Sequence, residues 1–139
     1  MIRAASGWTV DKNAEALSRI TGVASALGDS SRYLWLKLPY CDNFEIVARS
    51  TPLPILLLGG ESAGDPALFL NELASAVRAG SNVRGALVGR SVLYPGDEDP
   101  FAVACAVGRI VHQGWSARQA LESITGNRGR SLDLISRYF

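Results

Sequence analysis

Apolar and polar residues follow two different periods along this chain. Three short, mostly apolar runs that end at proline or glycine predict β-strands over residues 33–39, 55–58 and 85–88. Around them, apolar residues recur every three or four positions, which is typical of amphipathic helices. The helices predicted in this way span residues 9–26 (capped by Thr9 or Asp11), 44–49, 67–79, 100–112, 116–124 and 131–138. Because strands and helices alternate, the pattern predicts an α/β protein built of parallel βα units.

Polar residues and glycines gather where the three predicted strands end. In parallel α/β proteins, the carboxyl ends of the strands form the edge that binds ligands. Taken singly, each signal is more often structural, since a double glycine is commonly a tight turn and a strand lysine commonly lies at a sheet edge. The candidate site residues are Lys37 on the first strand, Gly59, Gly60, Glu61 and Ser62 after the second, and Gly89, Arg90 and Ser91 after the third.

Lys37 is the least expected of these residues, because it lies inside an apolar strand. Side chains alternate along a strand, so Lys37 shares a face with Trp35 and points away from Leu36. Burial on such a face would penalise the ammonium and favour the neutral, nucleophilic amine. The chain has only one other lysine, Lys12. The pattern therefore makes Lys37 a candidate nucleophile.

Composition narrows the classes of function further. A chain of 139 residues with 47% hydrophobic residues predicts one domain, 1–139, with a core of its own. The net charge of +1 and the scattered arginines favour neither nucleic acid nor a membrane surface as a partner. Cys41 and Cys105 have no metal-binding or redox spacing, so we expect reduced thiols, a cytoplasmic protein, and no metal or cofactor.

The three strand-end motifs resemble those of a known superfamily. Residues 35–40, 53–60 and 86–90 are similar to the sixth, seventh and eighth strands of class I (Schiff-base) aldolases of the deoxyribose-phosphate and archaeal-type fructose-bisphosphate superfamily. The nearest resemblance is to an actinobacterial (β/α)8 subgroup associated with inositol catabolism. It covers residues 9–112 and implies the last three strands of a TIM barrel, with residues 115–139 as a helical extension.

The resemblance implies a lyase that cleaves or forms a C–C bond in a small phosphorylated sugar or sugar acid. Lys37 would form the imine, and the glycine-rich strand ends, with Glu61, Ser62, Arg90 and Ser91, would hold a phosphate. Two alternatives stay open, namely a non-catalytic phosphate-ligand-binding or assembly module and a sugar-phosphate isomerase. Three strands are too few for a closed barrel. We therefore expect self-association or complementation by the missing barrel portion, and whether the chain alone is an enzyme stays open.

Overall fold

The structure is a computed structural model that describes residues 2–4, 7–9, 11–60 and 64–128. Its contacts divide the chain into two compact units, which are described separately. Unit 1 comprises residues up to 58 together with 75–87, and unit 2 comprises residues 59–74 together with those from 88 onward. The strands are β1 Ile2–Ala4, β2 Gly7–Thr9, β3 Leu36–Pro39, β4 Ile55–Leu58 and β5 Val83–Leu87. The helices are α1 Ala14–Ser25, α2 Phe44–Arg49, α3 Pro66–Ala79, α4 Arg90–Leu93, α5 Pro100–Gln113 and α6 Ala117–Asn127.

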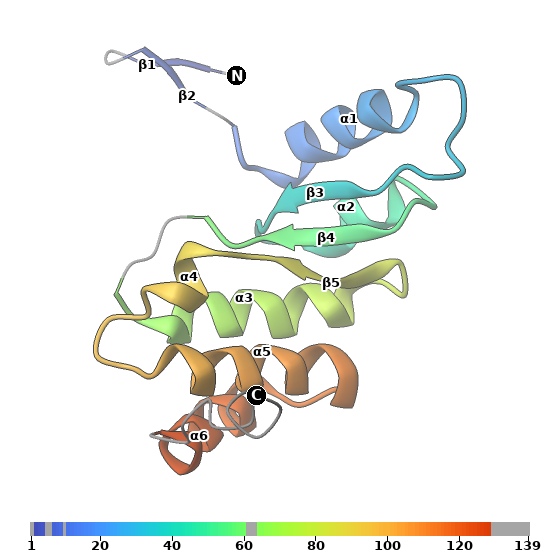
Figure 1. The fold of residues 1–139 in the computed structure, drawn as a ribbon. Helices are drawn as coiled ribbons and strands as arrows, with labels where there is room; N and C mark the ends of the chain where they lie inside the picture. Colours follow the sequence, from blue (N-terminus) through green and yellow to red (C-terminus); the bar gives the residue numbers. More distant parts are fainter. Residues whose placement is uncertain (1, 5–6, 10, 61–63, 129–139) are drawn as a thin grey trace, which may run out of the picture. The chain divides into compact units, whose positions relative to one another are not determined.

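Unit 1 contains a parallel sheet with the strand order β3-β4-β5 (Figure 1). This confirms the predicted parallel βα units. Lys37 pairs with Leu56, which pairs in turn with Gly85. The β4–β5 register shifts between Ile55 and Leu56, so that Arg84 is an extra residue in β5. Such a bulge leaves the extra residue outside the regular pairing.

The strand bounds differ from the predicted ones where local turns intervene. The bounds of β4 agree with the prediction. β3 begins at Leu36 rather than at residue 33, because the Leu34 N–H donates to the Ser31 carbonyl at 3.2 Å and closes a turn there. β5 begins two residues early, since the Ile55 N–H donates to the Asn82 carbonyl at 2.9 Å. The short antiparallel hairpin of β1 and β2 was not predicted.

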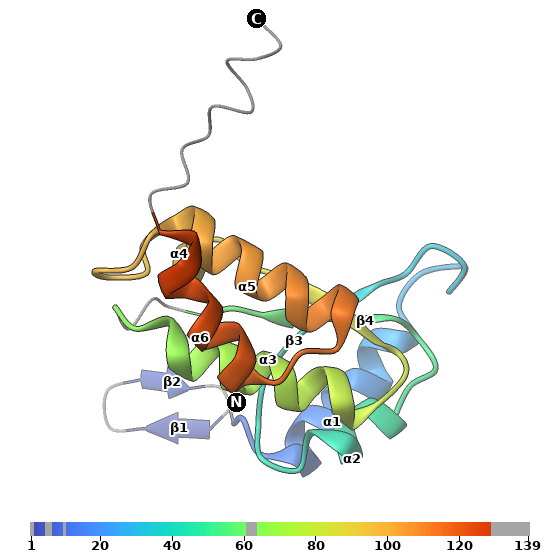
Figure 2. The ribbon, with the colours of Figure 1, turned by 90° about the horizontal axis from the view of Figure 1, so that it is seen from below.

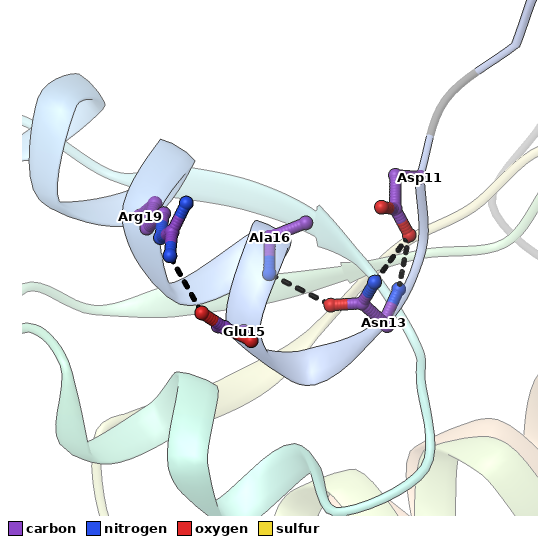
Figure 3. Close-up of polar contacts among 5 residues, drawn as sticks. All are labelled: Asp11, Asn13, Glu15, Ala16 and Arg19. Carbon is purple, nitrogen blue, oxygen red and sulfur yellow. Dashed lines mark hydrogen bonds and ion pairs between the residues drawn. The ribbon is translucent and has the colours of Figure 1, made fainter. Parts of the chain in front are cut away.

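Helix α1 begins at a cap other than the two predicted ones. The Asn13 side chain accepts a hydrogen bond from the Ala16 N–H at 2.8 Å, so Asn13 is the N-cap (Figure 3). The Asp11 carboxylate holds that cap by accepting from the Asn13 backbone and side-chain amides at 3.2 and 2.6 Å. An exposed Glu15–Arg19 ion pair at 2.6 Å supports the first turns. This arrangement satisfies N–H groups that a helix start would otherwise leave unpaired.

Asn82 joins the loop before β4 to the start of β5. Its Nδ2 atom donates to the carbonyls of Ala48, Thr51 and Leu53 at 3.0, 2.9 and 3.2 Å. These carbonyls lie at the end of α2 and in the loop that leads to β4. At Gly80 an added Cβ would lie 2.8 Å from the Ala48 Cβ, so the chain approaches α2 too closely for a side chain. Asn82 therefore acts as a clamp within unit 1.

Unit 2 contains the helix pair α5 and α6, which lie side by side in both views (Figures 1 and 2). Asp99 caps α5 by accepting from the Phe101 N–H at 2.8 Å, and Gly114 ends that helix in the left-handed conformation. Ser116 caps α6 in a capping box with Gln119, as the sequence predicted for its start. The predicted helix over 131–138 and the end of the 115–139 extension lie outside the described residues. Among the described helices, none combines the length and apolar character that a membrane crossing requires.

Candidate functional site

Strand β3 presents Lys37 to solvent while it buries its leucines. Leu36 and Leu38 are each 6% exposed, whereas Lys37 is exposed, as the predicted alternation requires. Paired residues of a parallel ladder point to the same face, so Lys37, Leu56 and Gly85 form one row across the sheet. Gly85 has no side chain, and it is buried.

Apolar side chains share this surface with Lys37. Trp35 precedes it on the same side of the chain and is 55% exposed, and Leu87 is 53% exposed. Leu56 and Leu58 on the central strand are half-buried. We call this surface the open face, and it comprises Trp35, Lys37, Leu56, Leu58, Gly85 and Leu87.

Lys37 remains in contact with water in this structure. The sequence pattern led us to expect that its face would be buried and the ammonium desolvated. The exposed side chain shows that this chain does not supply that desolvation. The physical reason lies in the sheet, because β3 is an outer strand of three and the open face retains large exposed side chains such as Trp35.

A pocket adjoins the open face at the amino ends of the strands. Trp35, Pro52, Pro54, Asn82 and Arg84 line it. Sequence reasoning missed this feature, although the two prolines before β4 and the arginine in β5 were visible signals. An indole and a guanidinium together offer a flat apolar surface beside a hydrogen-bonding cation.

In unit 2, the glycine turn after β4 and the turn after β5 contact each other. The Ser91 side chain is 5% exposed, and its Oγ donates to the Gly59 carbonyl at 2.6 Å. A Cβ on Gly59 would lie 2.7 Å from Val88 Cγ1, so the close approach requires glycine here. The Ser91 proton is directed at Gly59, which gives this hydroxyl a structural partner.

The remaining predicted phosphate ligands lie in different local settings. Gly60 has a φ of 65°, the left-handed conformation that glycine tolerates without cost. Gly89 is the N-cap of the short helix α4, and its carbonyl accepts from the N–H groups of Val92 and Leu93. Arg90 is exposed on the first turn of α4. Glu61 and Ser62 lie outside the described residues.

Two further features bear on chemistry near the sheet. Cys41 follows β3 and is 7% exposed, and burial, with help from Asp42 and Glu45, raises the pKa of its thiol above the ordinary value. A raised pKa makes the reactive thiolate scarcer. Within the described residues, histidine, cysteine and acidic side chains form no group of three that could hold a metal ion.

Comparison with known proteins identifies the relatives of this chain. Residues 2–111 match the Cgl0159-like family. Among solved structures, the chain resembles the crystal structure of Cgl0159 from Corynebacterium glutamicum (Brevibacterium flavum), with 34% identity and a TM-score of 0.72. The match covers 81% of this chain and 37% of that one. The chain therefore spans little more than a third of the length of this relative.

These findings correct the family suggested by the strand-end motifs. The assignment to class I aldolases is wrong, because the family that matches is a different one and the described residues form only three parallel strands. Short motifs such as a double glycine after a strand recur in many parallel βα proteins, so they discriminate poorly between families. The match over residues 2–111 is much longer than those motifs, and it shows that this chain belongs to the Cgl0159-like family.

Proposed function

We propose that Lys37 is an amine nucleophile that condenses with the carbonyl group of a small sugar or sugar acid in the cytoplasm. The amine lone pair attacks the carbonyl carbon to give a carbinolamine, which loses water to give an iminium ion. The bond between the α and β carbons then breaks, its electron pair passes into the iminium to give an enamine, and the β-hydroxyl loses its proton so that this fragment leaves as an aldehyde. Protonation and hydrolysis of the enamine release the second carbonyl product and regenerate the amine. The chain would thus contribute to a C–C lyase, with its three strands forming part of a closed (β/α)8 barrel.

The observation that carries this proposal is the position of Lys37 on an otherwise apolar face of the sheet. Its neighbour across the ladder is Leu56, and its exposed side chain leaves the amine accessible to a substrate carbonyl. In a closed barrel this face would be internal, and Lys37 would then face the enclosed substrate site.

Phosphate binding is a separate proposal for unit 2. Glycine turns with free backbone N–H groups bind phosphates in many folds, because such groups can approach the anion closely. Gly60, Gly89 and Arg90 keep this role in the proposal. Ser91 takes no part in it, because its hydroxyl donates to Gly59.

Reductive trapping tests the amine. The purified chain is incubated with glyoxylate, pyruvate or dihydroxyacetone phosphate and sodium cyanoborohydride, and the labelled lysine is identified by peptide mass spectrometry. Lys37 is expected to be labelled in preference to Lys12, which is also exposed and serves as the internal reference. The Lys37→Arg variant keeps the positive charge and should lose the label, whereas Lys12→Arg should keep it. Equal labelling of both lysines, or none, contradicts the proposal.

A second candidate is a binding or assembly module without turnover. It is favoured by the exposure of Lys37, which leaves the amine in contact with water. In that case the Lys37→Met variant should bind a sugar phosphate as tightly as the unmodified chain, as measured by calorimetry. The unmodified chain should form no product of C–C cleavage.

A further inference from the structure

We propose that the pocket at the amino ends of the strands, within unit 1, binds a small planar aromatic carboxylate. We call it the amino-end pocket, and it is lined by Trp35, Pro52, Pro54, Asn82 and Arg84. The residues of the proposed amine chemistry and of the proposed phosphate site are not among its lining residues. This inference therefore goes beyond the proposed function and does not depend on it.

The first argument concerns the size and the walls of the amino-end pocket. Its volume is about 320 Å³, which lies at the lower end of the range for small-molecule sites, about 300–1,000 Å³. The Leu36 N–H, next to Trp35, donates to the Pro54 carbonyl at 2.9 Å. The Ile55 N–H donates to the Asn82 carbonyl at the same distance. Because the hydrogen bonds of the sheet join these walls, the pocket is largely preformed, and binding costs little conformational entropy.

The second argument concerns the one cation among the lining residues. Arg84 is exposed, and its guanidinium has no ion-pair or hydrogen-bond partner among the residues that the structure describes. It is the extra residue of the β5 bulge, between the buried Val83 and Gly85. A bulge changes the direction of a side chain, and bulges are common beside binding sites. The fold thus places at this pocket a planar cation that its own contacts do not use and that suits a carboxylate.

The third argument concerns the apolar walls. Trp35 is more than half exposed, so part of its indole ring is open to contact. Pro52 and Pro54 add aliphatic surface and bring no backbone N–H group to the pocket. Aromatic rings pair favourably with an indole in offset or edge-to-face arrangements. A planar ring can therefore contact these walls without leaving buried polar groups unpaired.

The fourth argument separates a carboxylate from a sugar or a phosphate. The amide protons of Asn82 are already donated to three backbone carbonyls. The side-chain donors left in the pocket are the guanidinium of Arg84 and the indole N–H of Trp35. A sugar has several hydroxyl groups and a phosphate has three acceptor oxygens, so each requires more partners than these. A carboxylate has two oxygens, which a single guanidinium binds through two parallel hydrogen bonds.

A chemical-shift titration tests the proposal. The ¹⁵N-labelled chain is titrated with 2-naphthoate, and the indole N–H signal of Trp35 is followed, assigned with the Trp35→Phe variant. We expect this signal to shift with a Kd of about 1 mM or lower. The signal of Trp115 is the internal reference, because this indole also lies beside a guanidinium, that of Arg109 at 4.8 Å, but does not line the pocket. It should stay in place.

Two further ligands separate the contributions of charge and ring. The uncharged 2-naphthamide keeps the ring and lacks the carboxylate, whereas trans-decalin-2-carboxylate keeps the charge and lacks the planar ring. Each should bind the unmodified chain at least about 10-fold more weakly than 2-naphthoate, because one loses the contact with the guanidinium and the other the contact with the indole.

Two arginine variants locate the ligand. Arg84→Gln removes the charge and should weaken 2-naphthoate binding about 10-fold, while the affinity for 2-naphthamide stays unchanged. Arg32→Gln is the matched control, because Arg32 is also exposed and lies beside an aromatic ring, 5.3 Å from the centroid of Tyr33, but does not line the pocket. It should leave both affinities unchanged. Circular dichroism confirms that both variants fold.

Three results would overturn the proposal. One is a titration with 2-naphthoate in which the Trp35 signal stays in place or shifts no more than that of Trp115. Another is an Arg84→Gln variant that binds 2-naphthoate as tightly as the Arg32→Gln variant does. The third is tighter binding of 2-naphthyl phosphate than of 2-naphthoate, which would make a phosphate ester the ligand. Trapping at Lys37 is read by mass spectrometry, so either proposal can fail while the other stands.

Discussion

Replacing Asn82 with alanine removes a clamp that holds the start of β5 to the loop before β4. Its side-chain amide donates hydrogen bonds to the backbone carbonyls of Ala48, Thr51 and Leu53 at 2.9 to 3.2 Å. An amide nitrogen has two protons, so one of them must be shared between two acceptors. Alanine cannot donate to any of the three carbonyls, and the β4–β5 pairing loses the link that fixes its start.

The expected loss of stability follows from the two protons of the Asn82 side-chain amide. A hydrogen bond contributes about 1 kcal/mol net, and a buried carbonyl left without a partner costs about 1–3 kcal/mol. Because Asn82 is only half-buried, water can replace part of what is lost. We therefore expect Asn82→Ala to lower the free energy of unfolding by about 2 kcal/mol, which corresponds to a melting temperature lower by about 6 °C.

Urea unfolding followed by tryptophan fluorescence and circular dichroism measures this change. Asn71→Ala is the matched control, because the Asn71 amide also donates to a backbone carbonyl, that of Ala67 at 2.8 Å, but on an exposed helix. That substitution should change the free energy of unfolding by no more than about 0.5 kcal/mol. Asn82→Asp replaces the donor with an acceptor and should destabilise at least as much as alanine. Equal free energies for the Asn82→Ala and Asn71→Ala variants would refute the clamp.

Three further predictions concern single side chains. The Thr21 hydroxyl is buried without a hydrogen-bond partner in the described structure. Thr21→Val should therefore raise the free energy of unfolding, measured in urea, by about 1 kcal/mol, and a lower free energy of unfolding would contradict this. Ser91→Ala removes the hydrogen bond to Gly59 and should lower the free energy of unfolding by about 1 kcal/mol. The phosphate affinity, measured by calorimetry, should stay unchanged, and weaker phosphate binding would show that Ser91 is a ligand. Burial raises the pKa of the Cys41 thiol, so its stabilising contribution is complete below the unfolded-state pKa of about 8.5 and is lost as the pH rises through the higher folded-state value. Cys41 should therefore react with iodoacetamide more slowly in the folded chain than in urea, and equal rates would count against its burial.

Several elements could be predicted because their signals are local. The apolar run of β4 lies between Pro54 and Gly59, and both ends of the strand were predicted correctly. The starts of α5 and α6 follow from Asp99 and Ser116, whose side chains cap the residues directly after them. Such signals act within a few residues, so the rest of the fold does not alter them.

Other elements escaped prediction because a competing contact decided them. Three polar residues, Asp11, Lys12 and Asn13, directly precede α1, and the cap is Asn13 because Asp11 orients it through two hydrogen bonds. β3 was predicted too long, since its apolar residues do not reveal that Leu34 closes a turn on Ser31. The β5 bulge at Arg84 arises from its pairing with β4, which the sequence of β5 alone does not encode.

The sequence by itself determined which side chains share a face. Period-two alternation in a strand places Trp35 and Lys37 opposite Leu36, and the structure shows that division. It likewise placed glycines after β4 and near the end of β5, where the chain must turn closely.

Only the tertiary structure decided what those faces and turns contact. Lys37 is exposed because burial depends on whether other strands cover a sheet, and that is not a property of one strand. Ser91 donates to Gly59 across 32 positions of sequence, a separation that only folding brings to 2.6 Å. The strand-end motifs suggested the wrong family for the same reason, because short motifs record only local geometry. Which residues cover a strand, and which strand pairs with it, depends on residues far apart in the chain.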